Sequence, residues 1–333
     1  MSKRILVTGS AGFIGSHFCE HILANTDWHI VALDGLNYAA NLDRIRDSKH
    51  YDEDRITFVY HNLQSPIASL IHSKMGELNY VLHFAAESHV DRSLVDAIPF
   101  ALTNVVGTTN LLEYIRKYQS ETLERYIGFN TDEVFGPAPD GVYHTEDYKF
   151  APSNPYAAAK AGQWAMEFAF AHFSGLPISM THTMNAVGER QHPEKFLPMI
   201  IRNLLNGDKI TLHATGGRYS TRCWIHPRTI SDALVFLLDN AETEESYNIV
   251  GEEMSVYDIA NWVCQTVKGR DLKESDYECK DAHSQRPGHD FRYALDGTKL
   301  KEMGWTPPVI LRKSLKKTVQ WCMKPKNRHW LGL

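Results

Sequence analysis

The chain has few of the features that mark nucleic-acid-binding, secreted or membrane-spanning proteins. Its 333 residues carry a formal net charge of -5, and Lys and Arg are scattered instead of forming a basic run, which argues against a nucleic-acid partner. No run of about 18 apolar residues occurs, and the apolar segment near the start is too short for the core of a signal peptide. We therefore expect neither a membrane span nor export. Internal repeats and low-complexity tracts are also absent from the sequence.

Cysteine is scarce, and its spacing fits neither a disulfide framework nor a metal site. The five cysteines are odd in number and widely separated: Cys19, Cys223, Cys264, Cys279 and Cys322. We expect a reducing cytoplasm and no metal. Hydrophobic residues make up 43% and charged residues 23%, the balance of an ordinary globular protein with room for one or two domains.

A glycine-rich turn near the N-terminus indicates a dinucleotide site. Residues 5–7 form a short apolar run, and Gly9, Gly12 and Gly15 follow it before a helical pattern over 16–24. Glycines at this spacing allow a tight turn and close approach of the backbone to a pyrophosphate at a helix N-terminus. A second apolar run at 30–33 ends in Asp34, whose carboxylate can accept from a ribose 2′-hydroxyl and repels a 2′-phosphate. The pattern predicts NAD in preference to NADP.

Strand-like runs alternate with helical segments through the first half of the chain. Further runs lie at 56–60, 80–85, 125–129 and 178–183, which predicts an α/β fold with a Rossmann-type, doubly wound parallel sheet. After residue 185 the pattern is less regular, as expected of a smaller, interleaved α/β substrate domain. We predict an NAD-binding domain of residues 1–184 with about 224–248, and a substrate-binding domain of residues 185–223 with about 249–333. Small or polar residues follow the strands and should line one groove: Gly9, Asp34, Asn62, Ala85, Ala86, Asn130, Thr131 and Asn185.

Tyr156 and Lys160 are the first candidates for chemistry. They lie four residues apart near the start of a helix predicted over 155–173, so both side chains fall on one helical face. An ammonium beside a phenol favours the phenolate and lowers the phenol pKa from about 10. Because Thr131 comes at the end of a strand before this helix, we expect a hydride transfer between a hydroxyl and NAD.

The chain resembles the extended short-chain dehydrogenase/reductase family, and within it the nucleotide-diphosphate-hexose 4,6-dehydratases. The glycine and Tyr/Lys motifs carry only the superfamily resemblance. The segments 36–42 (LNYAANL) and 104–108 (NVVGT) also match, and the specific ones are 85–93 (AAESHVDRS), 131–136 (TDEVFG), 193–195 (PEK) and 286–290 (RPGHD).

The resemblance implies a reaction for the residues around Thr131. Tyr156, helped by Thr131, would take the proton of the sugar C4 hydroxyl while hydride passes to a tightly bound NAD. Glu133 would then remove the acidified C5 proton, and a protonated Asp132 would donate to the departing C6 hydroxyl. Hydride returned to C6 gives a 4-keto-6-deoxy sugar, so the enzyme would be a hydro-lyase.

The resemblance also implies binding residues and assembly. NAD would contact Gly9, Gly12, Phe13, Ile14, Gly15, Asp34, Asn62, Leu63, Ala85, Ala86, Asn104, Tyr156 and Lys160. A dTDP- or UDP-glucose type substrate would contact Ser88, His89, Asn185, Glu194, Lys195, Arg222 and Arg286, with the arginines on the diphosphate. Two long helices, expected over 95–118 and 155–173, resemble those that pair in family homodimers.

Several positions depart from the family pattern. Asn130 stands where Ser is usual, Ala186 replaces one Asn of a pair, and Cys223 replaces an Asp. The segment 214–220 is about two residues longer than the family loop, and 226–228 (HPR) replaces a more typical aromatic-Val-acid run. We expect these changes to cluster where the nucleotide is held, which leaves the base and the hexose open.

Three other functions stay open at the level of sequence. A 4-epimerase of the same superfamily is disfavoured because it does not need Asp132 and Glu133. A 5,6-dehydratase needs the same acid and base and differs in where the hydride returns. A non-catalytic NAD-binding regulator would have no reason to keep Thr131, Tyr156 and Lys160.

Overall fold

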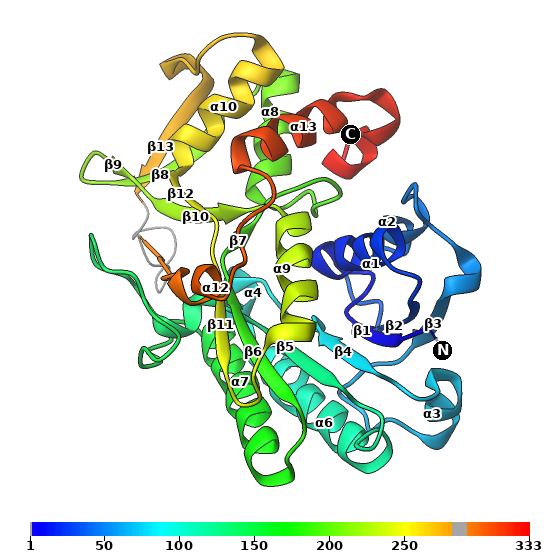
Figure 1. Ribbon diagram of the computed structural model, residues 1–333. Helices are drawn as coiled ribbons and strands as arrows, with labels where there is room; N and C mark the ends of the chain where they lie inside the picture. The colour runs from blue at the N-terminus through cyan, green and yellow to red at the C-terminus, as the bar shows by residue number, and fades with distance from the viewer. Residues whose placement is uncertain (1, 282–291) are drawn as a thin grey trace.

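A seven-stranded parallel sheet organises the computed structural model, which describes residues 2–281 and 292–333 (Figure 1). The strand order is β11-β6-β5-β4-β1-β2-β3, and each pair of neighbours is parallel. The predicted α/β class with a Rossmann-type sheet is thereby confirmed. The strands are β1 (Arg4–Thr8), β2 (His29–Asp34), β3 (Ile56–Tyr60), β4 (Tyr80–His83), β5 (Arg125–Thr131), β6 (Ile178–Thr183) and β11 (Ser246–Ile249).

Helices cover both faces of this sheet because its strands are apolar on both sides. On one face, Phe18 and Ile22 of α1 (Phe13–Asn25) pack with Leu234 of α9 (Pro227–Asn240) and with alternate strand residues. On the other face, Leu111 and Phe170 belong to the second core cluster. The helices there are α3 (Ser69–Met75), α6 (Gly107–Tyr118) and α7 (Pro155–Ser174), while α2 (Asp43–Arg46) lies beside α1 (Figure 1).

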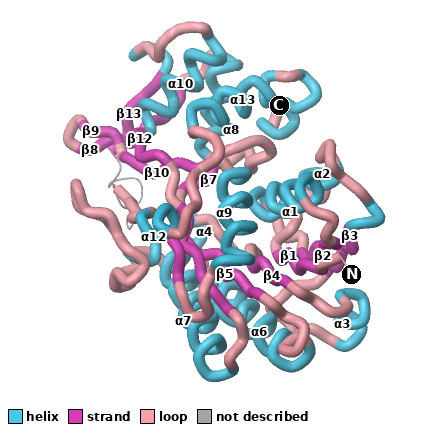
Figure 2. Tube along the Cα trace, viewed as in Figure 1, coloured by secondary structure: helices cyan, strands magenta, loops and turns pink. Residues whose placement is uncertain are grey.

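A smaller unit lies above the carboxyl ends of the strands (Figure 2). Two three-stranded sheets, ordered β12-β10-β7 and β13-β8-β9, pack with three helices around a separate core cluster. Its strands are β7 (Asn185–Ala186), β8 (Ile210–Thr215), β9 (Arg218–Tyr219), β10 (Thr221–Ile225), β12 (Glu252–Ser255) and β13 (Tyr277–Asp281). Its helices are α8 (Phe196–Asn206), α10 (Val256–Lys268) and α13 (Leu311–Met323), and the short α12 (Thr298–Glu302) lies against β11.

The helix expected over 95–118 begins at Ile98 and runs to Tyr118, with a π-helical turn in its course. α4 (Val90–Val95) ends at Asp96, which has an extended backbone and whose Oδ1 accepts from the Ile98 amide at 3.1 Å. The chain resumes with α5 (Ile98–Phe100), continues through a π-helical turn, Ala101–Val106, and then enters α6. A carboxylate that caps a new turn is the physical reason for the break. The helix expected over 155–173 is confirmed as α7.

Short elements complete the chain, and some escaped prediction. α9 was not recognised as a helix, and the strand expected over 80–85 ends at His83. Single 3-10 turns span Glu53–Arg55, Asp132–Phe135, Glu274–Asp276 and Pro325–Leu331. Within residues 2–281 and 292–333, none of the helices combines the length and the apolar character needed to cross a membrane.

Candidate active site

A cleft of about 360 Å³ lies at the carboxyl ends of the parallel strands. Ligands of open α/β sheets bind at this edge. Most of the site residues predicted from the sequence line it: Gly9, Gly12, Phe13, Ile14, Gly15, Asp34, Asn62, Leu63, Ala85, Ala86, Ser88, Thr131, Tyr156, Lys160, Asn185 and Lys195.

The glycine turn between β1 and α1 brings backbone to the cleft where side chains do not fit. Gly9 has a φ of +67°, and a Cβ there would lie 2.7 Å from the Ala85 amide nitrogen. A Cβ at Gly15 would lie 2.3 Å from the carbonyl oxygen of Gly9. The turn therefore needs glycine at both positions, and it leaves the N-terminus of α1 facing the cleft, where an anion is favoured.

Asp34 ends β2 and is held by backbone donors. Its Oδ2 accepts from the Ala11 amide at 2.9 Å, and its Oδ1 accepts from the Leu36 amide at 2.7 Å. Burial raises the pKa of Asp34, while the Leu36 and Ala11 amides and then Arg44 act in the opposite direction. The carboxylate is thus held at the edge of the cleft, where it could accept a hydrogen bond from a ribose hydroxyl.

Thr131 joins the cleft to a pair of carboxylates. It is the last residue of β5, and its Oγ1 accepts from the Glu133 amide at 3.3 Å and donates to Asp132 Oδ1 at 3.0 Å. Within the described residues, Asp132 Oδ2 is buried and has no hydrogen-bond partner. Burial, and then the charge of Glu133, raise the pKa of Asp132 to about 7. A carboxyl that is half protonated near neutrality can serve as an acid.

Glu133 is connected to the helix that carries the Tyr/Lys pair. Asn154 donates from Nδ2 to Glu133 Oε2 at 3.1 Å. The same side chain caps α7, because its Oδ1 accepts from the Ala157 amide at 2.9 Å. Asn154 therefore fixes the Glu133 carboxylate relative to Tyr156, which is the second residue of α7.

Tyr156 and Lys160 lie on one face of α7, but the expected lowering of the phenol pKa is not found. Burial, followed by the charges of Glu133 and Asp132, raises the pKa of Tyr156, and Thr131 acts in the opposite direction. The ammonium of Lys160 donates to the carbonyl oxygen of Phe129 at 2.5 Å and to Gln163 Oε1 at 2.6 Å. A buried ammonium needs such acceptors, and these two lie behind the cleft wall.

The other predicted binding residues are more scattered. Asn104 lies behind the cleft, where Oδ1 accepts from the Glu87 amide at 2.8 Å and Nδ2 donates to the Glu87 carbonyl at 3.1 Å. His89 Nε2 lies 3.7 Å from Glu194 Oε1, which also accepts from the Tyr38 hydroxyl at 3.1 Å. These contacts connect the segments after β2 and β4 to the one before α8.

Of the two predicted diphosphate arginines, the structure describes one. Arg222 is buried on β10, outside the lining of the cleft, and its guanidinium carbon lies 5.1 Å from the Tyr293 ring centroid. Its charge lowers the pKa of Asp132, so it lies near the acidic pair. Arg286 and the 286–290 segment lie outside the described residues.

Some lining residues were not predicted as site residues. Tyr38 and Asn37 belong to the segment 36–42 that carried part of the resemblance, and this signal could have found them. Four others, Arg44, Thr103, Gln191 and His192, belong to no recognised motif, and they reach the cleft from helices and loops. The additional lining residues include Asn37, Tyr38, Arg44, Thr103, Gln191 and His192.

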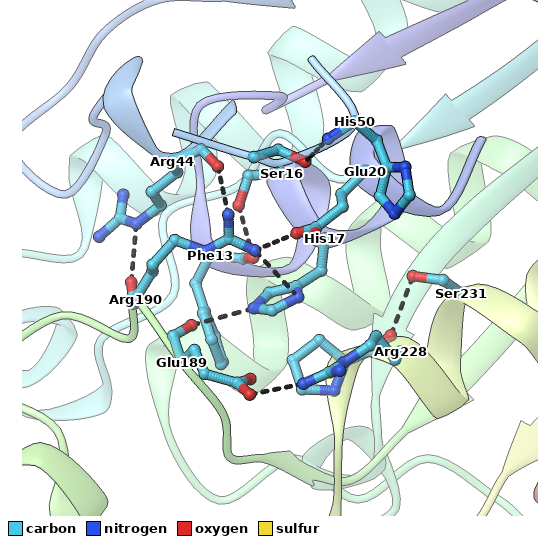
Figure 3. Close-up of polar contacts among 12 residues, drawn as sticks. Phe13, Ser16, His17, Glu20, Arg44, His50, Glu189, Arg190, Arg228 and Ser231 are labelled. Atoms are coloured by element: carbon cyan, nitrogen blue, oxygen red, sulfur yellow. Dashed lines mark hydrogen bonds and ion pairs between the residues drawn. The ribbon is translucent and has the colours of Figure 1, made fainter. Parts of the chain in front are cut away.

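The departure at 226–228 lies in a buried network behind the cleft (Figure 3). His226 Nε2 lies 2.8 Å from Glu189 Oε2, and Arg228 donates to Glu189 Oε1 at 2.5 Å. His17 of α1 contacts the Glu189 carbonyl at 2.9 Å, and Arg190 pairs with Glu20 of the same helix. Contrary to expectation, His226 and Arg228 do not line the cleft: through Glu189 they connect the segment after β7 to the start of α9, while His17 and the Arg190–Glu20 pair connect it to α1.

The sheet, the glycine turn and the Tyr/Lys pair define the class as an extended short-chain dehydrogenase/reductase. The sequence profile of the family described as GDP-mannose 4,6 dehydratase matches residues 6–318. The chain is 35% identical to dTDP-glucose 4,6-dehydratase of Shigella flexneri, over 98% of this chain and 94% of the relative. It is 34% identical to a trifunctional UDP-glucose 4,6-dehydratase of Arabidopsis thaliana, over 99% of this chain and 48% of that protein.

Solved structures agree with these relatives. The crystal structure of a dTDP-glucose 4,6-dehydratase from Streptomyces venezuelae, which has NAD bound, superposes with a TM-score of 0.87 at 34% identity and covers 98% of both chains. The chain belongs to the GDP-mannose 4,6 dehydratase family.

Proposed function

We propose that this protein is an NAD-dependent hydro-lyase that converts a nucleotide-diphosphate hexose of the dTDP- or UDP-glucose type to a 4-keto-6-deoxy sugar. The observation that carries the proposal is the buried carboxyl of Asp132 beside Thr131, with a raised pKa and a free Oδ2 among the described residues. Simple oxidation or epimerisation at C4 needs Tyr156 but has no use for an acid kept protonated beside it. The names of the relatives support the same reaction class.

The residues that line the cleft fit the cofactor. The glycine turn offers backbone and a helix N-terminus to a pyrophosphate, and Asp34 offers a carboxylate to a ribose. NAD, when bound, would accept hydride from sugar C4 and later return it to C6. We propose that the unit of the seven-stranded sheet holds NAD and that the smaller unit holds the nucleotide sugar, with Ser88, Asn185 and Lys195 at the cleft.

Each step then has a residue in place. Tyr156 takes the proton of the C4 hydroxyl, and Thr131 orients that hydroxyl. The resulting ketone acidifies C5, so Glu133 can remove the C5 proton. Asp132 donates its proton to the C6 oxygen, which leaves as water. Burial and the charge of Glu133 raise the pKa of Asp132 to about 7, so a large fraction of this carboxyl carries the proton that it must donate.

We further propose a cytoplasmic homodimer. Four apolar side chains are exposed along the segment from the end of α4 to the start of α6, beside α7: Val95 (89% exposed), Ile98 (69%), Leu102 (41%) and Val106 (41%). An exposed apolar stripe on adjacent helices suits pairing with a second copy of the chain. The five cysteines are all unpaired, which supports a reducing compartment.

The reaction is tested by incubating the purified protein with dTDP-, UDP-, CDP- and GDP-hexoses. A 4-keto product absorbs in alkali, and mass and NMR analysis of that product separates a 4-keto-6-deoxy sugar from a 5,6-ene. No turnover with any of these substrates would refute the proposal. In Glu133→Gln, dehydration at the wild-type rate would refute the assignment of the base.

A further inference from the structure

A second buried carboxylate lies behind the Tyr/Lys pair. Glu167 is on α7, two turns beyond Lys160, and its side chain is completely buried. Its Oε1 accepts from the Tyr126 hydroxyl and from Gln163 Nε2, both at 3.0 Å, and its Oε2 accepts from Asn130 Nδ2 at 3.1 Å. Burial raises the pKa of this carboxyl, while its three donors and the charge of Lys160 act in the opposite direction and favour the ionised form.

The backbone of β5 makes room for this carboxylate. A Cβ at Gly128 would lie 2.1 Å from Glu167 Oε2, so a side chain at that position and the carboxylate exclude each other. Asn130, which donates to the same oxygen, is one of the positions where the chain departs from the family pattern. Gly128 and Asn130 thus form a site on the strand that leads directly to Thr131.

Gln163 connects the carboxylate to Lys160. An ammonium only donates, so the amide of Gln163 must present Oε1 to Lys160, at 2.6 Å. Its Nε2 then points the other way and requires an acceptor, which Glu167 Oε1 provides. Without an acceptor at position 167, Gln163 would no longer be held with its Oε1 toward Lys160.

Glu167 affects the pKa of Lys160, because few other charges lie around this ammonium. Burial lowers the pKa of Lys160 to about 8, while the charge of Glu167 raises it. His83 of β4 and His182 of β6 also face this ammonium, and burial together with Lys160 holds the pKa of each far below its usual range. Both imidazoles are therefore neutral at pH 7, as are the phenols of Tyr126 and Tyr156, whose pKa values are raised.

We propose that Glu167 is a positioning residue that acts through Gln163 to keep Lys160 oriented and protonated in the wall of the cleft. The inference rests on the proposed function only for the role of Lys160 in hydride transfer. In the proposed reaction the phenolate form of Tyr156 takes the proton of the C4 hydroxyl, and a protonated Lys160 on the same helix face favours that phenolate.

The isosteric variant Glu167→Gln tests the charge while sparing the fold. Asn130 Oδ1 has no hydrogen-bond partner within the described residues, so a flip of the Asn130 amide can accept from the new Gln side chain. The unfolding temperature should therefore stay close to that of the wild type. Glu113→Gln, on the exposed surface of α6, is the matched control.

The first measurement is the titration of Lys160 by NMR of the holoenzyme, with lysine labelled at Cε and the signal assigned by its loss in Lys160→Arg. Loss of the countercharge should move the midpoint down by about one pH unit in Glu167→Gln. It should not move in Glu113→Gln. An unchanged midpoint in Glu167→Gln would overturn the proposal, and this readout needs no substrate.

The second measurement is the rate of hydride transfer from C4 in a single turnover, a step in which Asp132 takes no part. With a midpoint near 8 lowered by one unit, the rate in Glu167→Gln should fall about fivefold at pH 8 and change little at pH 6. The double variant Gln163→Glu/Glu167→Gln places the charge directly against Lys160 and should restore both the midpoint and the rate. A loss that is equal at both pH values and is not restored would show a purely structural role.

Discussion

Asn154 offers a way to slow one step of the proposed reaction while leaving the step before it intact. Its side chain donates to Glu133 Oε2 at 3.1 Å and accepts from the Ala157 amide at 2.9 Å. In Asn154→Asp the helix cap is kept, because Asp and Asn cap about equally well. The donor to Glu133, however, is replaced by a second carboxylate.

The size of the effect follows from these contacts. A hydrogen bond to a charged group contributes about 1.5–3 kcal/mol, and a like charge at this distance raises a carboxyl pKa by about 1–3 units. At 1.36 kcal/mol for each factor of ten in rate, loss of this hydrogen bond alone should slow removal of the C5 proton about 10- to 100-fold. Asn154→Ser, which keeps a cap but loses the reach to Glu133, should be intermediate.

Stopped-flow absorbance of NADH is the assay. Oxidation at C4 does not need Glu133, so NADH should form at nearly the wild-type rate in Asn154→Asp and then persist, because its return to C6 must wait for elimination. Exchange of the C5 proton with solvent deuterium should slow in parallel. If NADH formation and elimination slow by the same factor, or if C5 exchange keeps its wild-type rate, the positioning of Glu133 by Asn154 is refuted.

Three further predictions concern the acid, the cofactor and the assembly. Asp132 has a folded-state pKa of about 7, above its unfolded value, so dehydration should decline as the pH rises through 7, and Asp132→Asn should remove that decline along with most activity. Since a buried carboxylate costs stability above its unfolded pKa, the same variant should raise the unfolding temperature more at pH 8 than at pH 5, as calorimetry would show. In Asp34→Ala the preference for NAD over NADP should fall at least tenfold in binding titrations, and an unchanged ratio would contradict the role of Asp34. Val95→Lys combined with Leu102→Lys should convert a dimer to a monomer in sedimentation, whereas a monomeric wild type would contradict the dimer.

Local sequence signals predicted the sheet and much of the chemistry. The runs at 56–60 and 178–183 match β3 and β6, and the pattern over 155–173 matches α7, because burial on a regular element leaves a regular pattern. Thr131, Tyr156 and Lys160 meet at the cleft as expected, since strand ends and helix faces are determined by spacing alone.

Tertiary contacts account for what the sequence did not reveal. The start at Ile98 is the one local exception, because it depends on the Asp96 carboxylate that accepts from the Ile98 amide. The orientation of Lys160 depends on Gln163 and on a backbone carbonyl of β5, neither of which any motif marks. Arg44 was missed for the same reason: it is buried and donates to the carbonyl oxygens of Ala11, Ala39 and Arg190, so it holds the loops that line the cleft.

The positions that depart from the family pattern lie in different parts of the structure. Asn130 lines the cleft, and its amide also donates to Glu167, whereas His226 and Arg228 lie outside the cleft lining and contact Glu189. Both carboxylates are buried and accept from several donors, so each of these substituted side chains has a partner within the protein. Cys223 differs, because it lies on β10 beside Arg222 and its thiol pKa is raised by burial and by the nearby Glu253 and Asp132. A difference in the hexose that this enzyme accepts should therefore be sought at β10 and at the cleft-lining Asn130 and Ala186, and not at 226–228.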